Sequence, residues 1–195
     1  MKLNVLFVLT LGLTLSLLSG CAHTVERVDT KEAIDLSGRW NDTDSRLVAE
    51  EMVNQVLGGA WIDNHQKEHD KKPVVVVGLV YNKSHEHISA ETFVKDVERA
   101  FINSGRVRLV QASDKREELR RERAAQQEFA SMETAKAWGK ELGADFMLNG
   151  DINSIVDTYK KERVNFYKVN MELSNLETNE IVWIGDKEIK KYINN

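Results

Sequence analysis

Cysteine and proline are nearly absent from this sequence, which has one residue of each in 195. A lone cysteine cannot form a disulfide within the chain, and it cannot supply the clustered thiolates of a zinc or redox site. A lone proline, Pro73, excludes a proline-rich extended linker. The folded part must therefore be held together by side-chain packing.

A basic excess is also lacking. The chain has 27 Lys and Arg against 31 Asp and Glu, which gives a net charge of −4. A protein that neutralises phosphates needs a clustered basic excess, so we expect no nucleic-acid partner. Apolar residues make up 42% of the chain and aromatic residues 7%, which is typical of a globular rather than a disordered protein.

Signatures of catalysis are missing as well. The sequence has no Gly-x-Ser-x-Gly nucleophile turn, no phosphate-binding glycine loop, and no Gly-x-Gly-x-x-Gly after a strand. We therefore predict no catalytic residue and no cofactor.

The N-terminus carries the most specific signal in the sequence. Met1-Lys2 is followed by the mostly apolar residues 3–18 and then by Ser19, Gly20 and Cys21. This order of charge, apolar core and small residues is typical of a secretory signal peptide, which we place at residues 1–20. A transmembrane anchor is the alternative, but the apolar run is shorter than the ~20 residues that a spanning helix needs.

Leu18-Ser19-Gly20-Cys21 also resembles the lipobox of bacterial lipoproteins, in which the chain is cut before the cysteine and the thiol is acylated. An ordinary cleaved signal remains the alternative. Cys21 is therefore the predicted lipidation site, and the acyl chains would hold the protein on a membrane. Ala22, in place of the Asp that retains some lipoproteins at the inner membrane, is compatible with the periplasmic face of the outer membrane.

Residues 21–35 are predicted to be the lipidated cysteine and a short tether, and residues 36–195 a single domain. The 14 residues after Cys21 show no clean periodicity and mix both signs of charge. Fully extended, they would reach at most ~50 Å.

Helices are predicted where apolar residues recur at three and four positions behind a capping residue. The first follows the capping oxygens of residues 41–44 and ends at Gly58-Gly59, where a glycine can take a positive φ. Others are expected over 61–69, from Ser89 to Gly105, over the charged residues 115–129, and from Ser131 to Gly143 with Leu142 inward.

Strands are predicted over residues 36–40, 74–80, 107–110, 145–152 and 164–173, and from Ile181. The apolar run 74–80 is expected at the centre of the sheet, with Gly78 admitting a neighbouring helix. The apolar phase slips near Tyr167-Lys168, which predicts a bulge. The order of elements indicates an α/β fold, in which a mixed β-sheet is flanked by helices and ends in a C-terminal β-hairpin.

Two histidine pairs could bind a metal: His65 and His69 on one helical face, and His85 and His87 on a strand, with carboxylates nearby in sequence. Nothing fixes the remaining ligands, so solvated histidines are the better interpretation and we predict no metal site. Asp145 and Asp151, six residues apart on one strand, could form an acid–base pair, but no activated nucleophile accompanies them.

The remaining candidates concern contacts with other proteins. The charged residues 115–128 are either a solvated helix face or a docking surface of mixed charge. The tryptophans are expected to pack in the core, and Trp61 is the one that could be exposed at an interface. The four tryptophans are Trp40, Trp61, Trp138 and Trp183.

Three stretches, together with the lipobox, resemble the LpoB family of outer-membrane lipoproteins. They are Leu36-Ser-Gly-Arg-Trp-Asn-Asp-Thr-Asp44, then Lys72-Pro-Val-Val-Val-Val-Gly78 with Glu86-His-Ile88, and Gly139-Lys-Glu-Leu-Gly-Ala-Asp-Phe-Met-Leu-Asn-Gly150 before the terminal hairpin with Glu180-Ile-Val-Trp183. The wider group includes the TolB N-terminal domain and the secretion lipoprotein CsgG, so the resemblance implies a TolB-N-like fold.

The resemblance implies a protein without enzymatic activity that binds a bifunctional penicillin-binding protein and activates its peptidoglycan synthesis. It also implies attachment to the outer membrane through Cys21, and we expect a monomer. The alternative is a structural or assembly lipoprotein of an envelope complex, TolB-like or CsgG-like, without synthase activation. Family members from enterobacteria carry a long proline-rich linker, whereas the tether here has 14 residues and no proline.

Overall fold

The computed structural model describes residues 25–112, 115–122 and 142–194 of the chain. The chain divides into two compact units, Met1–Glu32 and Ala33–Asn195. In the first unit, the described residues 25–32 form a turn closed by a 3.0 Å hydrogen bond from Glu32 N–H to Asp29 O. The helices and strands given below all belong to the second unit.

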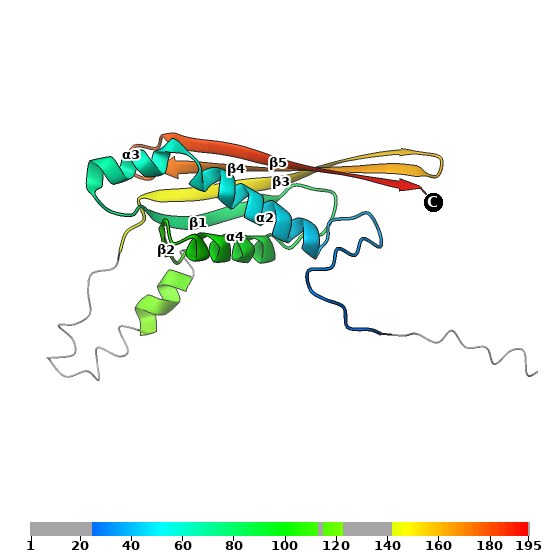
Figure 1. Ribbon diagram of the computed structural model, residues 1–195, viewed down its shortest axis with the longest axis horizontal. Helices are drawn as coiled ribbons and strands as arrows, with labels where there is room; N and C mark the ends of the chain where they lie inside the picture. The colour runs from blue at the N-terminus through cyan, green and yellow to red at the C-terminus, as the bar shows by residue number, and fades with distance from the viewer. Residues whose placement is uncertain (1–24, 113–114, 123–141, 195) are drawn as a thin grey trace, which may run out of the picture. The chain divides into compact units, whose positions relative to one another are not determined.

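A five-stranded mixed sheet, in the order β2-β1-β3-β4-β5, organises the second unit (Figure 1). Strands β2 (Arg108–Val110), β1 (Val74–Asn82) and β3 (Phe146–Tyr159) run parallel to one another. Strands β4 (Glu162–Asn175) and β5 (Ile181–Asn194) continue the sheet antiparallel to β3. The α/β class, the mixed sheet and the C-terminal hairpin expected from the sequence are thus confirmed.

Strand β1 shows why an apolar run without alternation forms a buried strand. Its first four residues, Val74–Val77, are all buried, and each buried valine contributes about 1.5–3 kcal/mol before entropy is counted. The central strand of the five is nevertheless β3, because β1 has only the short β2 on its other side. Gly78 faces β3 rather than a helix: a Cβ there would collide with Asn149 Oδ1.

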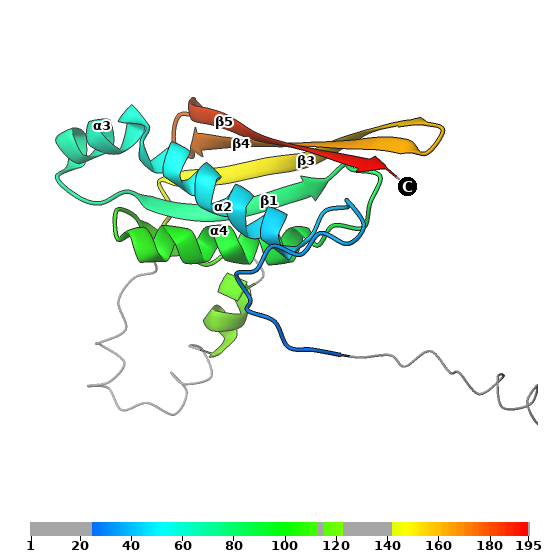
Figure 2. The ribbon, with the colours of Figure 1, turned by 45° about the vertical axis from the view of Figure 1, so that its right-hand side comes forward.

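Helices α2 (Asp42–Leu57) and α4 (Ala90–Ser104) lie side by side against one face of the sheet (Figures 1 and 2). Asn41 caps α2 in a capping box with Asp44, and Ser89 Oγ accepts the N–H of Thr92 to cap α4. Gly105 ends α4 in the left-handed region at φ 63°. These caps were all signalled by the sequence, and the two helices cover the core.

Helix α3 (Ala60–His69) follows α2 almost without a break. α2 ends at Gly58, as predicted, but Gly58 is right-handed at φ −79° and does not use the positive φ that is open to a glycine. Trp61 is buried at 4% exposure, and its Nε1 donates a 2.6 Å hydrogen bond to Val56 O at the end of α2. This contact turns the chain sharply between the helices and places Trp61 in the core rather than at an interface.

Strand β4 alternates without interruption, so the predicted bulge at Tyr167-Lys168 is wrong. Its pairing with both neighbours is continuous there, and the one register shift toward β5 lies at Leu173/Ser174. The inward side chains include two polar ones, Asn165 and Tyr167, which made the apolar phase look broken in the sequence. Polar residues can therefore occupy the buried face of a strand when their side chains have hydrogen-bond partners.

The charged segment is helical over residues 115–122. The rest of the helix predicted over 115–129, and residues 131–141 of the next predicted helix with Trp138, lie outside the described residues. Leu142, which we expected to point inward, is exposed.

Gly150 on β3 gives a test of how tightly the sheet packs. A Cβ at Gly150 would lie 2.6 Å from the backbone oxygen of Asn170 and 3.0 Å from Met171 Cγ. Because backbone cannot yield as a side chain does, we expect Gly150→Ala to lower the free energy of unfolding by about 1–3 kcal/mol, measured by urea denaturation. Gly143→Ala is the control, since nothing lies within 4 Å of a Cβ there; equal stability of the two variants would contradict the packing.

Candidate functional site

His65 and His69 lie on one face of α3, as predicted, with ring centroids 4.5 Å apart. The His65 side chain is 5% exposed, and its Nε2 lies 3.6 Å from Asp145 Oδ2, beyond hydrogen-bond distance. Burial lowers the pKa of His65 below its ordinary value, so the ring is neutral at pH 7. In the described part of the chain, no three His, Cys, Asp or Glu side chains converge as a metal site would require.

The other predicted pair, His85 and His87, lies in a loop rather than on a strand. His85 lies on an exposed loop, where its backbone N–H donates to Ser154 Oγ at 3.0 Å and its Nδ1 lies 3.2 Å from the same oxygen. His87 is exposed. This pair forms a loop contact to β3 rather than a cation site.

Asp145 and Asp151 do not form a carboxylate pair, because each has its own partners. Asp145 Oδ2 accepts the backbone N–H of Val74 at 2.8 Å and so joins β1 to the start of β3. Burial works against ionisation of Asp151, but hydrogen bonds from Asn170, Lys83 and Asn153 outweigh it and lower the pKa of that carboxyl. Both carboxylates are structural, and the lowered pKa of Asp151 keeps that carboxyl ionised at pH 7.

Residues 35–41, which we call the strap, form the most densely bonded irregular segment. The predicted strand over 36–40 is absent, and the strap instead crosses the end of the sheet. Asn165 Nδ2 donates to Gly38 O at 2.7 Å and Arg163 Nη2 to Ser37 O at 3.1 Å. Gly38 has φ +65°, and a side chain there would collide with Ile193, so only glycine lets the strap lie this close to β5.

Lys191 of β5 binds the strap through ion pairs and a hydrogen bond. Its Nζ contacts Asp44 Oδ2 at 2.6 Å, Asp35 Oδ2 at 2.7 Å and Arg39 O at 2.9 Å, and the side chain is only 11% exposed. Burial works against the charge, but the hydrogen bonds to Asp35 and Asp44 outweigh it and raise the pKa of Lys191. One ammonium group thus joins the strap, the N-terminus of α2 and the last strand.

Glu86 joins two of the stretches that carry the family resemblance. Its Oε2 accepts the backbone N–H of Trp40 at 3.1 Å, and its Oε1 accepts the hydroxyl of Tyr167 at 2.8 Å. The Trp40 ring packs edge-on against Tyr167 at 5.6 Å. Burial and the bond to Glu86 raise the pKa of Tyr167, so the phenol remains a neutral donor. Sequence reasoning found Trp40 and Glu86 but gave no sign that Tyr167 lies between them.

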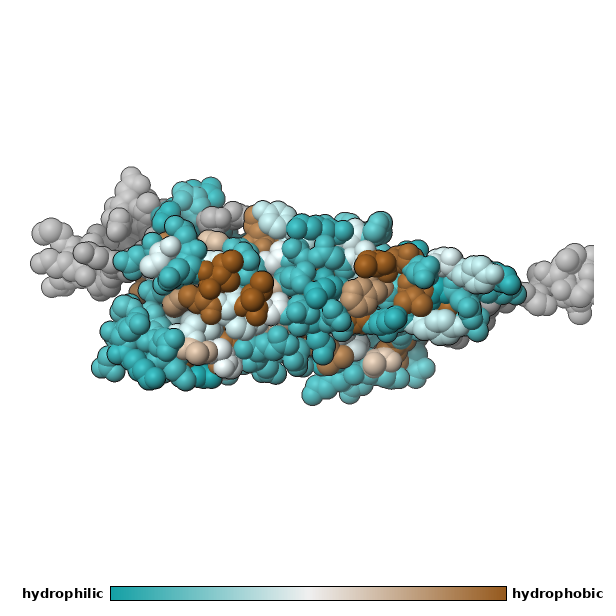
Figure 3. Space-filling view, turned by 90° about the horizontal axis from the view of Figure 1, so that it is seen from above, coloured by the Kyte–Doolittle hydropathy of each residue, from teal (hydrophilic) through white to brown (hydrophobic). Residues whose placement is uncertain are grey.

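The side of the molecule on which β5 lies carries apolar surface (Figure 3). Two separate clusters of apolar side chains stand out there from a hydrophilic surround. β5 exposes large side chains near both of its ends: Ile181 at 57%, Ile184 at 69% and Tyr192 at 62%. Exposed apolar groups that gather in this way mark interaction surfaces more often than scattered ones do.

A groove of about 750 Å³ lies on the face of the sheet opposite α2 and α4. Its walls come from β1, β3 and β4 and include Ala112 and Arg116, and its apolar side chains include Leu79 and Tyr81. A smaller hollow of about 210 Å³ adjoins it and shares Tyr81, Asn149 and Glu172. The volume of the groove and its exposed apolar side chains suit it to contact with another molecule.

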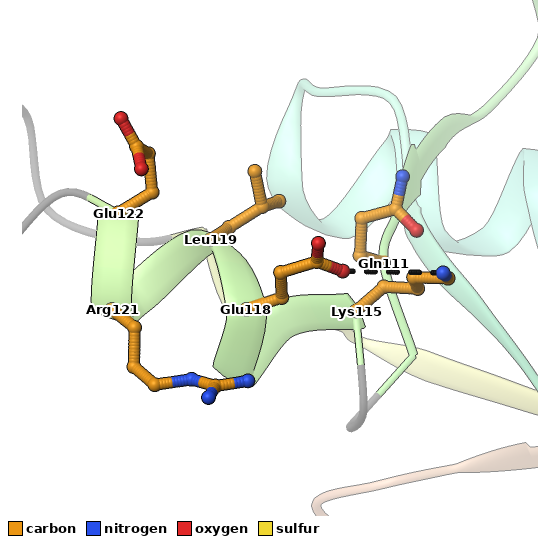
Figure 4. A pocket seen from close by; sticks show the side chains of 6 residues that line it. All are labelled: Gln111, Lys115, Glu118, Leu119, Arg121 and Glu122. Atoms are coloured by element: carbon orange, nitrogen blue, oxygen red, sulfur yellow. Dashed lines mark ion pairs between the residues drawn. The ribbon is translucent and has the colours of Figure 1, made fainter.

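The helix over residues 115–122 carries another hollow, which is an unlikely match for a ligand in shape (Figure 4). Its lining comes from that one helix and from Gln111, and Glu122 points away from the Lys115–Glu118 pair. Lys115 Nζ and Glu118 Oε2 are 3.9 Å apart and exposed, so the pair contributes little stability. This segment is a solvated face of mixed charge.

Cys21, the predicted lipidation site, lies outside the described residues. Among those that the structure describes, no helix has the length and apolar character needed to span a membrane.

Comparison with known proteins gives one family match. The model of the peptidoglycan-synthase activator LpoB matches residues 44–189. No curated protein matches the chain.

Among solved structures, the LpoB C-terminal domain from Escherichia coli is 19% identical, covers 78% of this chain and 99% of its own, and has a TM-score of 0.46. The LpoB C-terminal domain from Salmonella enterica is 17% identical, covers 75% and 98%, and has a TM-score of 0.45. The lipoprotein GNA1162 from Neisseria meningitidis is 15% identical, covers 63% and 85%, and has a TM-score of 0.42.

Removal of the Lys191 charge should loosen the strap. Lys191→Met leaves Asp44, which is 10% exposed, without its cation, so we expect a loss of about 1–3 kcal/mol in the free energy of unfolding at pH 7. Lys190→Met, on the exposed face of the same strand, is the control and should change stability by less than about 0.5 kcal/mol.

The stability difference between the wild type and Lys191→Met should depend on pH in a defined way. The hydrogen bond from Lys191 lowers the pKa of Asp35, so its contribution is present above the ordinary 3.8 and is lost as pH falls through the lowered pKa. The pKa of Lys191 is raised, so its contribution is present below 10.5 and is lost as pH rises through the raised pKa. Urea titrations should therefore show a constant difference between the wild type and Lys191→Met from about pH 5 to 9. A difference that grows toward acid would contradict the assignment.

Proposed function

The chain belongs to the LpoB family of peptidoglycan-synthase activators, and on that premise we propose that it is a lipid-anchored periplasmic protein that binds and activates a bifunctional penicillin-binding protein. The observation that carries this proposal is the family match over residues 44–189. That range runs from the first turn of α2 into β5 and includes β1 to β4 in full and residues 181–189 of β5. The proposal thus rests on the whole folded domain rather than on a short motif.

The activator would work by binding rather than by chemistry. A bound protein shifts an enzyme toward its active conformation only by as much as it prefers that conformation over the inactive one. A tenfold increase in the active fraction of a mostly inactive synthase requires a preference of about 1.4 kcal/mol, which a modest difference in contact area can supply. The contacts of Asp145 and Asp151 agree with this, because both carboxylates, which the sequence offered as an acid–base pair, are bound to other parts of the fold.

Acylated Cys21 would hold the protein at the periplasmic face of the outer membrane. Each buried methylene of an acyl chain contributes ~0.8 kcal/mol, so several chains on one cysteine make release negligible. The strap fixes where the tether ends, because Asp35 is bound to Lys191. The domain would then lie within ~50 Å of the anchor, and the synthase would have to reach toward the outer membrane to meet it.

Activation can be measured with the full-length protein in detergent. Added to a purified bifunctional penicillin-binding protein from the same organism, it should raise the initial rate of glycan polymerisation several-fold and saturably. A rate that stays unchanged, with no complex recovered by pull-down, would refute the proposal.

The anchor and the activator domain are predicted to be separable. Cys21→Ala, expressed with its signal peptide, should leave the membrane fraction yet still stimulate the purified synthase in solution, because the family match begins at residue 44. Fractionation and the polymerisation assay measure the two effects. Continued tight membrane association of the variant would contradict lipidation at Cys21.

A further inference from the structure

We propose that Glu172, at the junction of the groove and the adjoining hollow, receives a basic side chain of the partner protein. This inference rests on the proposed function and names the surface and the chemistry by which the partner would bind. It assigns to Glu172 a role in recognition, and to the apolar residues around it the role of holding the stem of the incoming side chain.

Glu172 differs from the neighbouring carboxylates because no cation contacts it. Arg116 also lines the groove, but its guanidinium donates to Gln111 O at 2.9 and 3.2 Å. In the described part of the chain its carboxylate has no hydrogen bond or ion pair. On β3, Asn149 pairs with Glu172, and Asp151, two residues further along that strand, is bound by Lys83. Asp186 and Glu188, which follow on β5, both contact Lys168, at 3.2 and 3.1 Å.

Glu172 also sits among apolar side chains rather than in open water. It pairs across the sheet with Asn149 on β3 and with Ile184 on β5, and Ile184 is 69% exposed. Leu79 and Tyr81 are 64% and 57% exposed on the same groove. A half-buried carboxylate that no cation contacts, beside exposed apolar groups, can form a charge-assisted hydrogen bond with a cation supplied from outside.

Arginine and lysine suit this surface because they combine a charged head with an apolar stem. The stem would lie along Ile184 and Leu79 while the head pairs with Glu172, and an arginine could also stack on the Tyr81 ring. The groove, of about 750 Å³, is large enough to admit such a side chain. Charge complementarity thus identifies the occupant as a basic side chain flanked by apolar ones.

The test uses the full-length protein in detergent and a purified bifunctional penicillin-binding protein. We expect Glu172→Lys to weaken binding at least tenfold and Ile184→Asp to do the same, whereas Glu172→Gln should weaken it less and reduce the dependence of affinity on salt. Ile102→Asp and Glu68→Lys are matched controls: Ile102 is 63% exposed on α4 and Glu68 is 71% exposed on α3, away from the groove. Unchanged thermal unfolding of each variant confirms that it folds.

The outcomes separate the two proposals. Wild-type protein that binds no synthase overturns both. Wild-type binding that Glu172→Lys and Ile184→Asp leave intact overturns the groove alone. A photo-crosslinker at position 184 should capture a synthase peptide that contains Arg or Lys beside apolar residues; capture of a second copy of this chain, or of its own residues, would contradict the inference.

Discussion

The Lys191 ammonium group is the contact on which the arrangement of the domain depends. It joins carboxylates of the strap and of the first turn of α2 to the last strand, across 152 residues in the case of Arg39. Without it, Asp44 would be a nearly buried charge with no cation, and the strap would lose its attachment to β5.

The two faces of the sheet differ in what covers them. α2 and α4 cover one face and supply the core, and the strap closes the end of that layer through Glu86 and Tyr167. The opposite face carries the groove with Leu79 and Tyr81. A protein whose function is to bind another protein needs such a face to remain accessible after its own core is complete.

Local features of the fold were predictable from the sequence because their causes are local. The valine run of β1, the Ser89 cap and the Gly105 terminus each depend on residues within one turn or one strand. The strap was misread as a strand because its partners, Asn165 and Lys191, are more than 120 residues away. The alternation of buried and exposed residues in β4 was misread because a tyrosine is usually placed on the exposed face. Tyr167 is buried because its hydroxyl donates to Glu86. Glu172 gave no signal at all, since a lone carboxylate in an alternating strand is ordinary until the absence of a contacting cation is visible.

The central claim is that this domain acts on a synthase that reaches it near the outer membrane. In-cell crosslinking of the intact protein, with partners identified by mass spectrometry, tests this most directly because it keeps the anchor, the tether and the envelope in place. The account predicts that a bifunctional penicillin-binding protein is the main partner recovered. Recovery of only outer-membrane components or of further copies of this chain would contradict it and would favour an assembly role.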